Sequence, residues 1–180
     1  MLRLVIPPIE LFDEAKQEFF HSKEYELRLE HSLVSLSKWE SKWCKPFLTT
    51  KDKSNQETID YIRCMTITQN VDPIAYSYIT QKEIDVITSY IDAPMTATTF
   101  SQPKENKTNR EIITAELIYY WMIAFQIPFE CQTWHLNRLL TLINVCNIKN
   151  QPKKKMSKKD AINQQRALNE ARKAKYNTKG

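Results

Sequence analysis

Two segments near the beginning of the chain have patterns of apolar residues that are typical of strands. Residues 2–6 predict a strand that is stopped by two prolines. In residues 24–31, tyrosine and leucine alternate with charged side chains, which predicts a second, half-buried strand. We expect the two strands to form a small antiparallel sheet. The intervening residues 10–20 are ambiguous between helix and strand.

The spacing of apolar residues becomes helical at residue 32. Trp39 and Trp43 follow two leucines at intervals of three or four, and the run ends at Pro46, which predicts an amphipathic helix. A second helix is predicted from Asn55, as its N-cap, to residue 65. A short third helix is predicted to begin at Asp72 and Pro73. A fourth is predicted from a capping box of Thr80 and Glu83 to residue 92.

The most apolar part of the chain lies between residues 110 and 148. Helices are predicted over residues 110–126 and 133–148, joined by a short turn into an antiparallel hairpin. The first helix is apolar on nearly all sides, so we expect it near the centre of the fold. Trp121 and Leu139 should then be buried in the hairpin. The inward face of the first helix is predicted to contain Ile113, Leu117, Tyr120, Trp121 and Ala124.

These elements predict a mainly α fold with a small N-terminal antiparallel β-sheet (α+β) and a separate basic C-terminal helix. Residues 1–150 are expected to form a globular body, with its strands in residues 1–31 and its helices in residues 32–150. Residues 151–180, here called the basic segment, are expected to form a conditional helix that becomes ordered on a partner.

Charge and helix signals distinguish the basic segment from the body. It carries ten basic and two acidic groups, a net of +8 in a chain of +5, so that the body has a net charge of −3. Pro152 breaks the chain, and Ser157 can cap a helix that extends to about Lys175. Ile162 and Leu168 are its sizeable apolar residues, which gives this helix little reason to dock on the body.

The residue composition excludes several kinds of chemistry. The one glycine, Gly180, stands at the end of the sequence, so a glycine-rich phosphate loop and a dinucleotide-binding fingerprint are excluded. No nucleophile elbow and no defensible acid/base pair of carboxylates is present. We therefore expect a non-enzymatic protein with no catalytic residues and no cofactor.

Metal and membrane sites are not expected either. The cysteines form no C-x-x-C pair, and although Cys131 and His135 share a helical face, buried or capping roles are favoured over metal binding. The longest apolar stretch, residues 117–129, is shorter than the ~20 residues of a membrane span. No secretory signal is recognised, so we expect a soluble cytosolic protein with reduced thiols.

The tryptophans and the basic side chains are the candidate functional residues. Indoles can stack on nucleic-acid bases, but the helical spacing favours a structural core over such a platform. His135, Asn137 and Arg138 are expected to pin the hairpin or to contact a partner, with the first role favoured. The predicted core residues are Trp39, Trp43, Trp121, Trp134 and Leu139.

The basic segment is the part of the chain most expected to carry function. Its lysines fit sequence-independent binding of phosphates, and its spaced arginines fit an acidic coiled coil equally well. A merely solubilising appendage is the third interpretation. The predicted partner-binding residues are Lys153, Lys154, Lys155, Lys158, Lys159, Arg166, Leu168, Arg172 and Lys173.

Several segments resemble a family of small proteins from tailed-phage and prophage gene clusters. The resemblance covers most of the chain and is strongest between residues 118 and 150. The segments that carry it are residues 35–47 (SLSKWESKWCKPF), 57–65 (ETIDYIRCM), 92–98 (DAPMTAT), 119–122 (YYWM), 127–130 (IPFE), 134–140 (WHLNRLL), 154–158 (KKMSK), 166–169 (RALN) and 177–180 (NTKG).

This family is identified with the tail assembly chaperones encoded beside the tape measure protein of siphophage-type phages. The resemblance implies a protein that binds the long helical tape measure protein and keeps it soluble while tail-tube subunits polymerise around it. Some such chaperones are made in two lengths by ribosomal frameshifting. The expected location is then the host cell cytoplasm during phage assembly, and self-association is possible.

Two alternatives remain open. The chain can be a minor virion structural protein of the tail or the head–tail connector, retained in the particle. It can also be a DNA-binding packaging or regulatory protein that uses the basic segment on phosphates.

Overall fold

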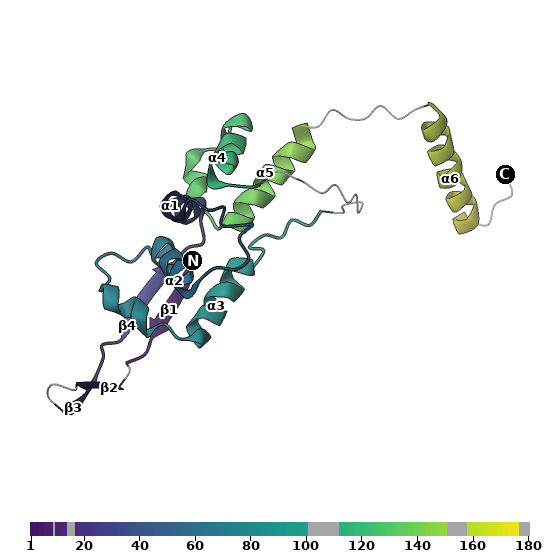
Figure 1. Ribbon diagram of the computed structural model, residues 1–180. Coiled ribbons are helices and arrows are strands. Elements are labelled where there is room, and N and C mark those ends of the chain that lie inside the picture. Colours follow the sequence, from purple (N-terminus) through teal and green to yellow (C-terminus); the bar gives the residue numbers. More distant parts are fainter. Residues whose placement is uncertain (9, 14–16, 101–111, 151–157, 177–180) are drawn as a thin grey trace. The chain divides into compact units, whose positions relative to one another are not determined.

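The computed structural model describes residues 1–8, 10–13, 17–100, 112–150 and 158–176 (Figure 1). In these residues the chain is mainly helical with a small N-terminal antiparallel sheet, which confirms the predicted α+β class. The chain divides into two compact units, Met1–Asn147 and Ile148–Gly180. The division falls close to the boundary predicted after residue 150.

The N-terminal part of the first unit consists of two antiparallel strand pairs. Strand β1 (Leu2–Ile6) pairs with β4 (Tyr25–Leu29), and β2 (Glu10–Asp13) pairs with β3 (Glu18–His21). The ambiguous segment is therefore a hairpin inserted between the two predicted strands. Leu4 and Leu27 face each other in the β1–β4 register, and both are buried.

Capping boxes that the sequence analysis did not predict begin two of the helices. Helix α1 (Leu33–Trp43) starts at Ser32, and α2 (Asn55–Met65) starts at Ser54 rather than at the expected Asn55. Ser54 is the better cap because its hydroxyl accepts from the N–H of Glu57 (3.2 Å), whose carboxylate accepts from the N–H of Ser54 (2.7 Å).

The remaining elements follow in the predicted order. The short helix after Asp72 is a 3₁₀ helix, and the Thr80 N–H donates to the carboxylate of Glu83 at the start of the next helix (2.9 Å), as the predicted capping box requires. The elements are η1 (Pro73–Tyr78), α3 (Gln81–Asp92), α4 (Ala115–Ala124), η2 (Phe129–Thr133), α5 (Leu136–Asn150) and α6 (Lys158–Tyr176).

Helix α1 organises the core of the first unit. It packs against α2, α4 and η2, while α3 packs against β1 (Figure 1). Trp39 on α1 and Leu139 on α5 are completely buried. Trp43, Trp121 and Trp134 are partly buried and pack against this core. The expectation that Trp121 is buried is therefore wrong, although the side chain does contact the core.

The orientation of α4 differs from the prediction. Ala115, Ile118 and Met122 face the core, whereas Tyr120 is 63% and Ile123 is 61% exposed. A helix that is apolar on nearly all sides has no pattern from which its inner face can be read. Here the N–H of Ala115 donates to the buried carboxylate of Glu40 (2.7 Å), and this long-range bond sets the rotation of the helix.

The predicted short turn between α4 and α5 is also wrong. Helix η2 lies between the two helices, and both α4 and η2 pack against α1. Residues 112–114 are not helical, and the predicted helix start at residue 110 lies outside the described residues. The side chain of Thr114 instead caps α4 by accepting from the N–H of Leu117.

Truncation of the chain after Asn150 should leave the melting temperature of the body almost unchanged. The truncation retains all of α5, and Ile162 and Leu168 of α6 are both more than half exposed. Truncation after Arg138 is the matched control, since it removes the buried Leu139 and Ile143 and should abolish cooperative unfolding. Thermal unfolding followed by circular dichroism measures both. A drop of many degrees after the first truncation would show that the basic segment stabilises the body.

Candidate functional site

The predicted binding residues of the basic segment fall into three groups. Arg166, Leu168, Arg172 and Lys173 lie on α6 and are exposed. Lys158 and Lys159 form the first turn of α6. Lys153, Lys154 and Lys155, together with the predicted break at Pro152 and the cap at Ser157, lie outside the described residues.

Helical spacing sorts the exposed residues of α6 into two stripes. Ile162, Arg166, Asn169, Lys173 and Tyr176 follow each other at intervals of four and three residues, so they share one face of the helix. Leu168, Arg172 and Lys175 form a second stripe by the same rule. Each stripe combines basic groups with an exposed apolar or aromatic side chain.

Tyr176 is a candidate contact residue that the sequence reasoning missed. Its side chain is 67% exposed at the end of α6, and the ammonium of Lys175 lies 5.7 Å from the centroid of its ring. The signal was present in the sequence, because Tyr176 stands fourteen residues after Ile162, two heptads along the same face.

The tryptophans belong to the packing of the body. The indole N–H of Trp39 donates to the backbone oxygen of Glu57 (2.9 Å), and that of Trp43 donates to the carboxylate of Asp60 (2.9 Å). The guanidinium of Arg138 lies 4.1 Å from the ring centroid of Trp134. These contacts attach the rings to neighbouring elements, which favours the structural interpretation over a base-stacking platform.

A buried polar cluster joins β4, α2, α3 and the start of α5. The ring Nδ1 of His31 lies 2.5 Å from the hydroxyl of Tyr61, and the rings of His31 and His135 are 5.2 Å apart. The Nε2–H of His135 donates to the backbone oxygen of Tyr90 (3.0 Å), and its Nδ1 accepts from the N–H of Asn137 (3.3 Å). Burial lowers the pKa of His31 to about 3, with a contribution from His135.

This geometry assigns His135 and Asn137 a structural role at the end of α3. The side-chain amide of Asn137 donates to the backbone oxygens of Ile91 and Ala93 (both 2.9 Å). His135 and Asn137 therefore fasten the C-terminal end of α3, not the expected hairpin. Both ring nitrogens of His135 have partners, so the weak Cys131/His135 metal pair gains no support. The described residues contain no group of three or more potential metal-binding side chains.

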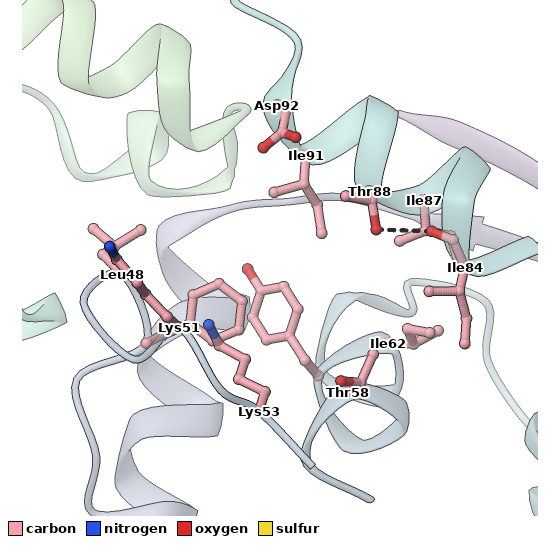
Figure 2. A pocket seen from close by; sticks show the side chains of 12 residues that line it. Leu48, Lys51, Lys53, Thr58, Ile62, Ile84, Ile87, Thr88, Ile91 and Asp92 are labelled. Carbon is pink, nitrogen blue, oxygen red and sulfur yellow. Dashed lines mark hydrogen bonds between the residues drawn. The ribbon is translucent and has the colours of Figure 1, made fainter. Parts of the chain in front are cut away.

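A groove of about 470 Å³ opens between α2, α3 and residues 46–53 (Figure 2). The stacked rings of Phe47 and Tyr61, with centroids 3.9 Å apart, form its buried part together with Ile62 and Ile87. Figure 2 shows Lys51 and Lys53 on one side of the groove and Ile84 and Ile91 of α3 on the other. Its lining is completed by Leu48, Thr58, Thr88 and Asp92.

Comparison with known proteins gives no further assignment. No protein-family model matches this chain, and no curated protein and no solved structure is significantly similar to it. Among the described residues, no helix has the length and hydrophobicity of a membrane span.

Proposed function

We propose that this protein is a non-enzymatic tail assembly chaperone of a siphophage-type phage. It would bind the tape measure protein, the tail-tube protein or both in the host cell cytoplasm while the tail is built. The observation that carries the proposal is the helix α6, on which Arg166, Leu168 and Arg172 are exposed, in a chain whose body has the opposite net charge. The sequence resemblance described above supports the choice of partner.

The distribution of basic and apolar side chains on α6 fits a protein partner. A helix whose exposed stripes mix cations with single apolar residues matches an acidic helical surface, in which carboxylates pair with the cations and the apolar residues enter small depressions. A polymerising tail would present such helices before its subunits bury them. The body can then act as the soluble carrier of the binding helix.

The two alternative functions predict different experimental results. A minor virion protein would remain in the finished particle, so mass spectrometry of purified virions separates it from a chaperone, which should be absent. A DNA-binding protein would use the total charge of the basic segment, and its affinity would fall log-linearly with salt concentration.

The direct test is co-expression of the tape measure protein with this chain. A chaperone should move the tape measure protein from the insoluble to the soluble fraction and be recovered with it in a pull-down. The chain truncated after Asn150 is the control and should lose both effects. Retention of full solubilising activity by the truncated chain would contradict the proposed role of the basic segment.

The Leu168→Ala variant should weaken binding to tape measure fragments by about tenfold, because burial of one leucine side chain is worth roughly 1.5–3 kcal/mol. Fluorescence anisotropy measures this change. DNA binding should not change, since an aliphatic side chain neutralises no phosphate.

Charge reversal at Lys153, Lys154 and Lys155 is the complementary variant and should abolish any DNA binding. If Leu168→Ala is silent for every protein partner while the lysine reversal removes tight DNA binding at physiological salt, the DNA-binding alternative replaces the chaperone.

A further inference from the structure

The groove between α2 and α3 is a site that α6 and its partner do not explain. Its walls are two helices of the body, and its interior is made by buried aromatic and isoleucine side chains. Hydrogen bonds hold Phe47 and Tyr61 in place. The N–H of Phe47 donates to the Glu40 carboxylate (2.8 Å), and the Tyr61 hydroxyl contacts the ring of His31. The apolar surface is therefore preformed.

The groove is elongated along α3. Its lining residues on this helix recur at intervals of three and four, from Ile84 to Asp92, which corresponds to about 12 Å at the rise of an α-helix. Thr58 and Ile62 of α2 form the facing wall at the same spacing. Two helical stripes of this kind can accept apolar side chains at positions i, i+3 or i+4, and i+7 of a docked helix.

The two lysines that line the groove, Lys51 and Lys53, differ from the nearby Lys42 and Lys45 in their ion pairs. Lys42 and Lys45 are paired with the carboxylates of Asp60 (2.5 Å) and Glu57 (2.6 Å). Lys51 and Lys53 form no ion pair with any described residue. The Lys53 ammonium donates to the backbone oxygen of Thr50 and lies 4.2 Å from the ring centroid of Phe47.

Lys53 is also partly buried. Burial lowers the pKa of Lys53, because the ammonium is partly removed from water, although the charge of the Glu57 carboxylate opposes the shift. Asp92, at the opposite end of the α3 stripe, is the carboxylate among the described lining residues. Residues 46–53 carry Lys51 and Lys53 against Asp52, so this side of the groove has a net positive charge and is open to an anionic partner.

We propose that this groove binds an amphipathic helix of a protein partner, with aliphatic anchors in the isoleucine-lined interior and glutamate or aspartate side chains against Lys51 and Lys53. The occupant follows from the two helical walls, the length of the α3 stripe and two lysines that form no ion pair with a described residue. Body and basic segment then select the same class of partner, an acidic amphipathic helix, at two separate sites. The groove would bind such a helix whether or not the chaperone proposal holds.

The test uses the full chain with ¹³C-labelled isoleucine δ1-methyl groups. The probe is a synthetic 18-residue amphipathic peptide with leucines at i, i+3 and i+7 and glutamates beside them, and a peptide with lysines in place of the glutamates is its control. The acidic peptide should shift the methyl signals of Ile62, Ile84 and Ile91 saturably. The core methyl of Ile118 should not move.

Matched variants separate the groove from the rest of the surface. Lys51→Glu should weaken binding of the acidic peptide by about tenfold, as expected when an attraction becomes a repulsion beside an apolar site. Lys82→Glu is the control, because Lys82 is exposed on α3 but stands on the helix side away from Ile84 and Thr88. Leu168→Ala should leave the groove shifts unchanged, so a failure of the chaperone proposal is distinguished from a failure of this one.

Four results would overturn the proposal. The acidic peptide can fail to shift the groove methyls up to millimolar concentration, or the lysine peptide can bind equally well. Sodium dodecanoate can shift these methyls where the peptide does not, which would make the groove a site for small aliphatic carboxylates. Finally, light scattering can detect a dimer whose formation alone shifts the same methyls, which would assign the groove to a second copy of the chain.

Discussion

Replacement of Trp39 by alanine is expected to lower the free energy of unfolding by about 3–5 kcal/mol, as large truncations in a close-packed core do. Trp39 is completely buried on α1, the helix that contacts α2, α4 and η2. Its ring meets the edge of Phe47 at a centroid distance of 5.0 Å. The variant also leaves the backbone oxygen of Glu57 without its indole donor.

Urea unfolding followed by circular dichroism measures the effect, and a domain of ordinary stability could be unfolded by it. Trp39→Phe retains most of the ring and should cost less. Trp121→Ala is the second comparison, because Trp121 is only partly buried and its loss should cost clearly less than that of Trp39. Equal losses at the two positions would show that α4 turns Trp121 into the core, contrary to the structure.

The parts of the fold that could be predicted are those determined by short-range pattern. A short apolar run before two prolines identified β1, alternation identified β4, and the Thr80–Glu83 pair located the start of α3. All three signals depend on neighbours within a few residues. The basic segment was also recognised, since charge composition needs no tertiary contact. Its helix extends over Lys158–Tyr176, against an expected end near Lys175.

The parts that could not be predicted depend on contacts between distant residues. The Glu40 carboxylate accepts from the N–H groups of Phe47 (2.8 Å) and Ala115 (2.7 Å), so one side chain fixes both the edge of the groove and the rotation of α4. A buried glutamate on a helix looks like any surface glutamate in the sequence. The apolar pattern of α4 offered no alternative guide, and the predicted inner face was wrong for that reason.

The candidate groove was missed for a related cause. Ile84, Ile87 and Ile91 recur at helical spacing in the sequence, and such an apolar stripe ordinarily indicates a core position. Only Ile87 is buried, while Ile84 and Ile91 remain partly exposed along the groove. Which part of an amphipathic stripe stays open depends on how far its neighbours extend, and the spacing of residues does not contain that information.

The buried histidines make the body sensitive to acid at a pH where carboxylates are still charged. His31 is 2% exposed, and its pKa is lowered from 6.5 to about 3 by burial and by the neighbouring His135. Burial also lowers the pKa of His135, although its hydrogen bond to Tyr90 opposes the shift. Protonation of His135 at Nδ1 would in addition place a proton against the N–H of Asn137. Folding therefore favours both rings in their neutral form.

The free energy of unfolding should accordingly change little between about pH 7.5 and 8 and decrease as the pH falls below 6.5. Below pH 6.5, His31 is protonated in the unfolded chain but stays neutral in the folded chain. One such group lowers the free energy of unfolding by about 1.4 kcal/mol per pH unit. The loss at pH 5 should therefore be roughly 2 kcal/mol from His31 alone, measured by urea unfolding at a series of pH values. The Glu57 carboxylate, whose pKa is lowered to about 2 by the hydrogen bond from Lys45, should lower the free energy of unfolding further only below pH 4.5.

The His31→Gln variant has no imidazole to protonate at this position. It should be less stable at pH 7.5, but its stability should depend less steeply on pH between pH 6.5 and 5. The His21→Gln variant, at an exposed position on β3, is the control and should reproduce the parent curve. An unchanged slope in His31→Gln would mean that His31 is not the group whose burial destabilises the folded state in acid.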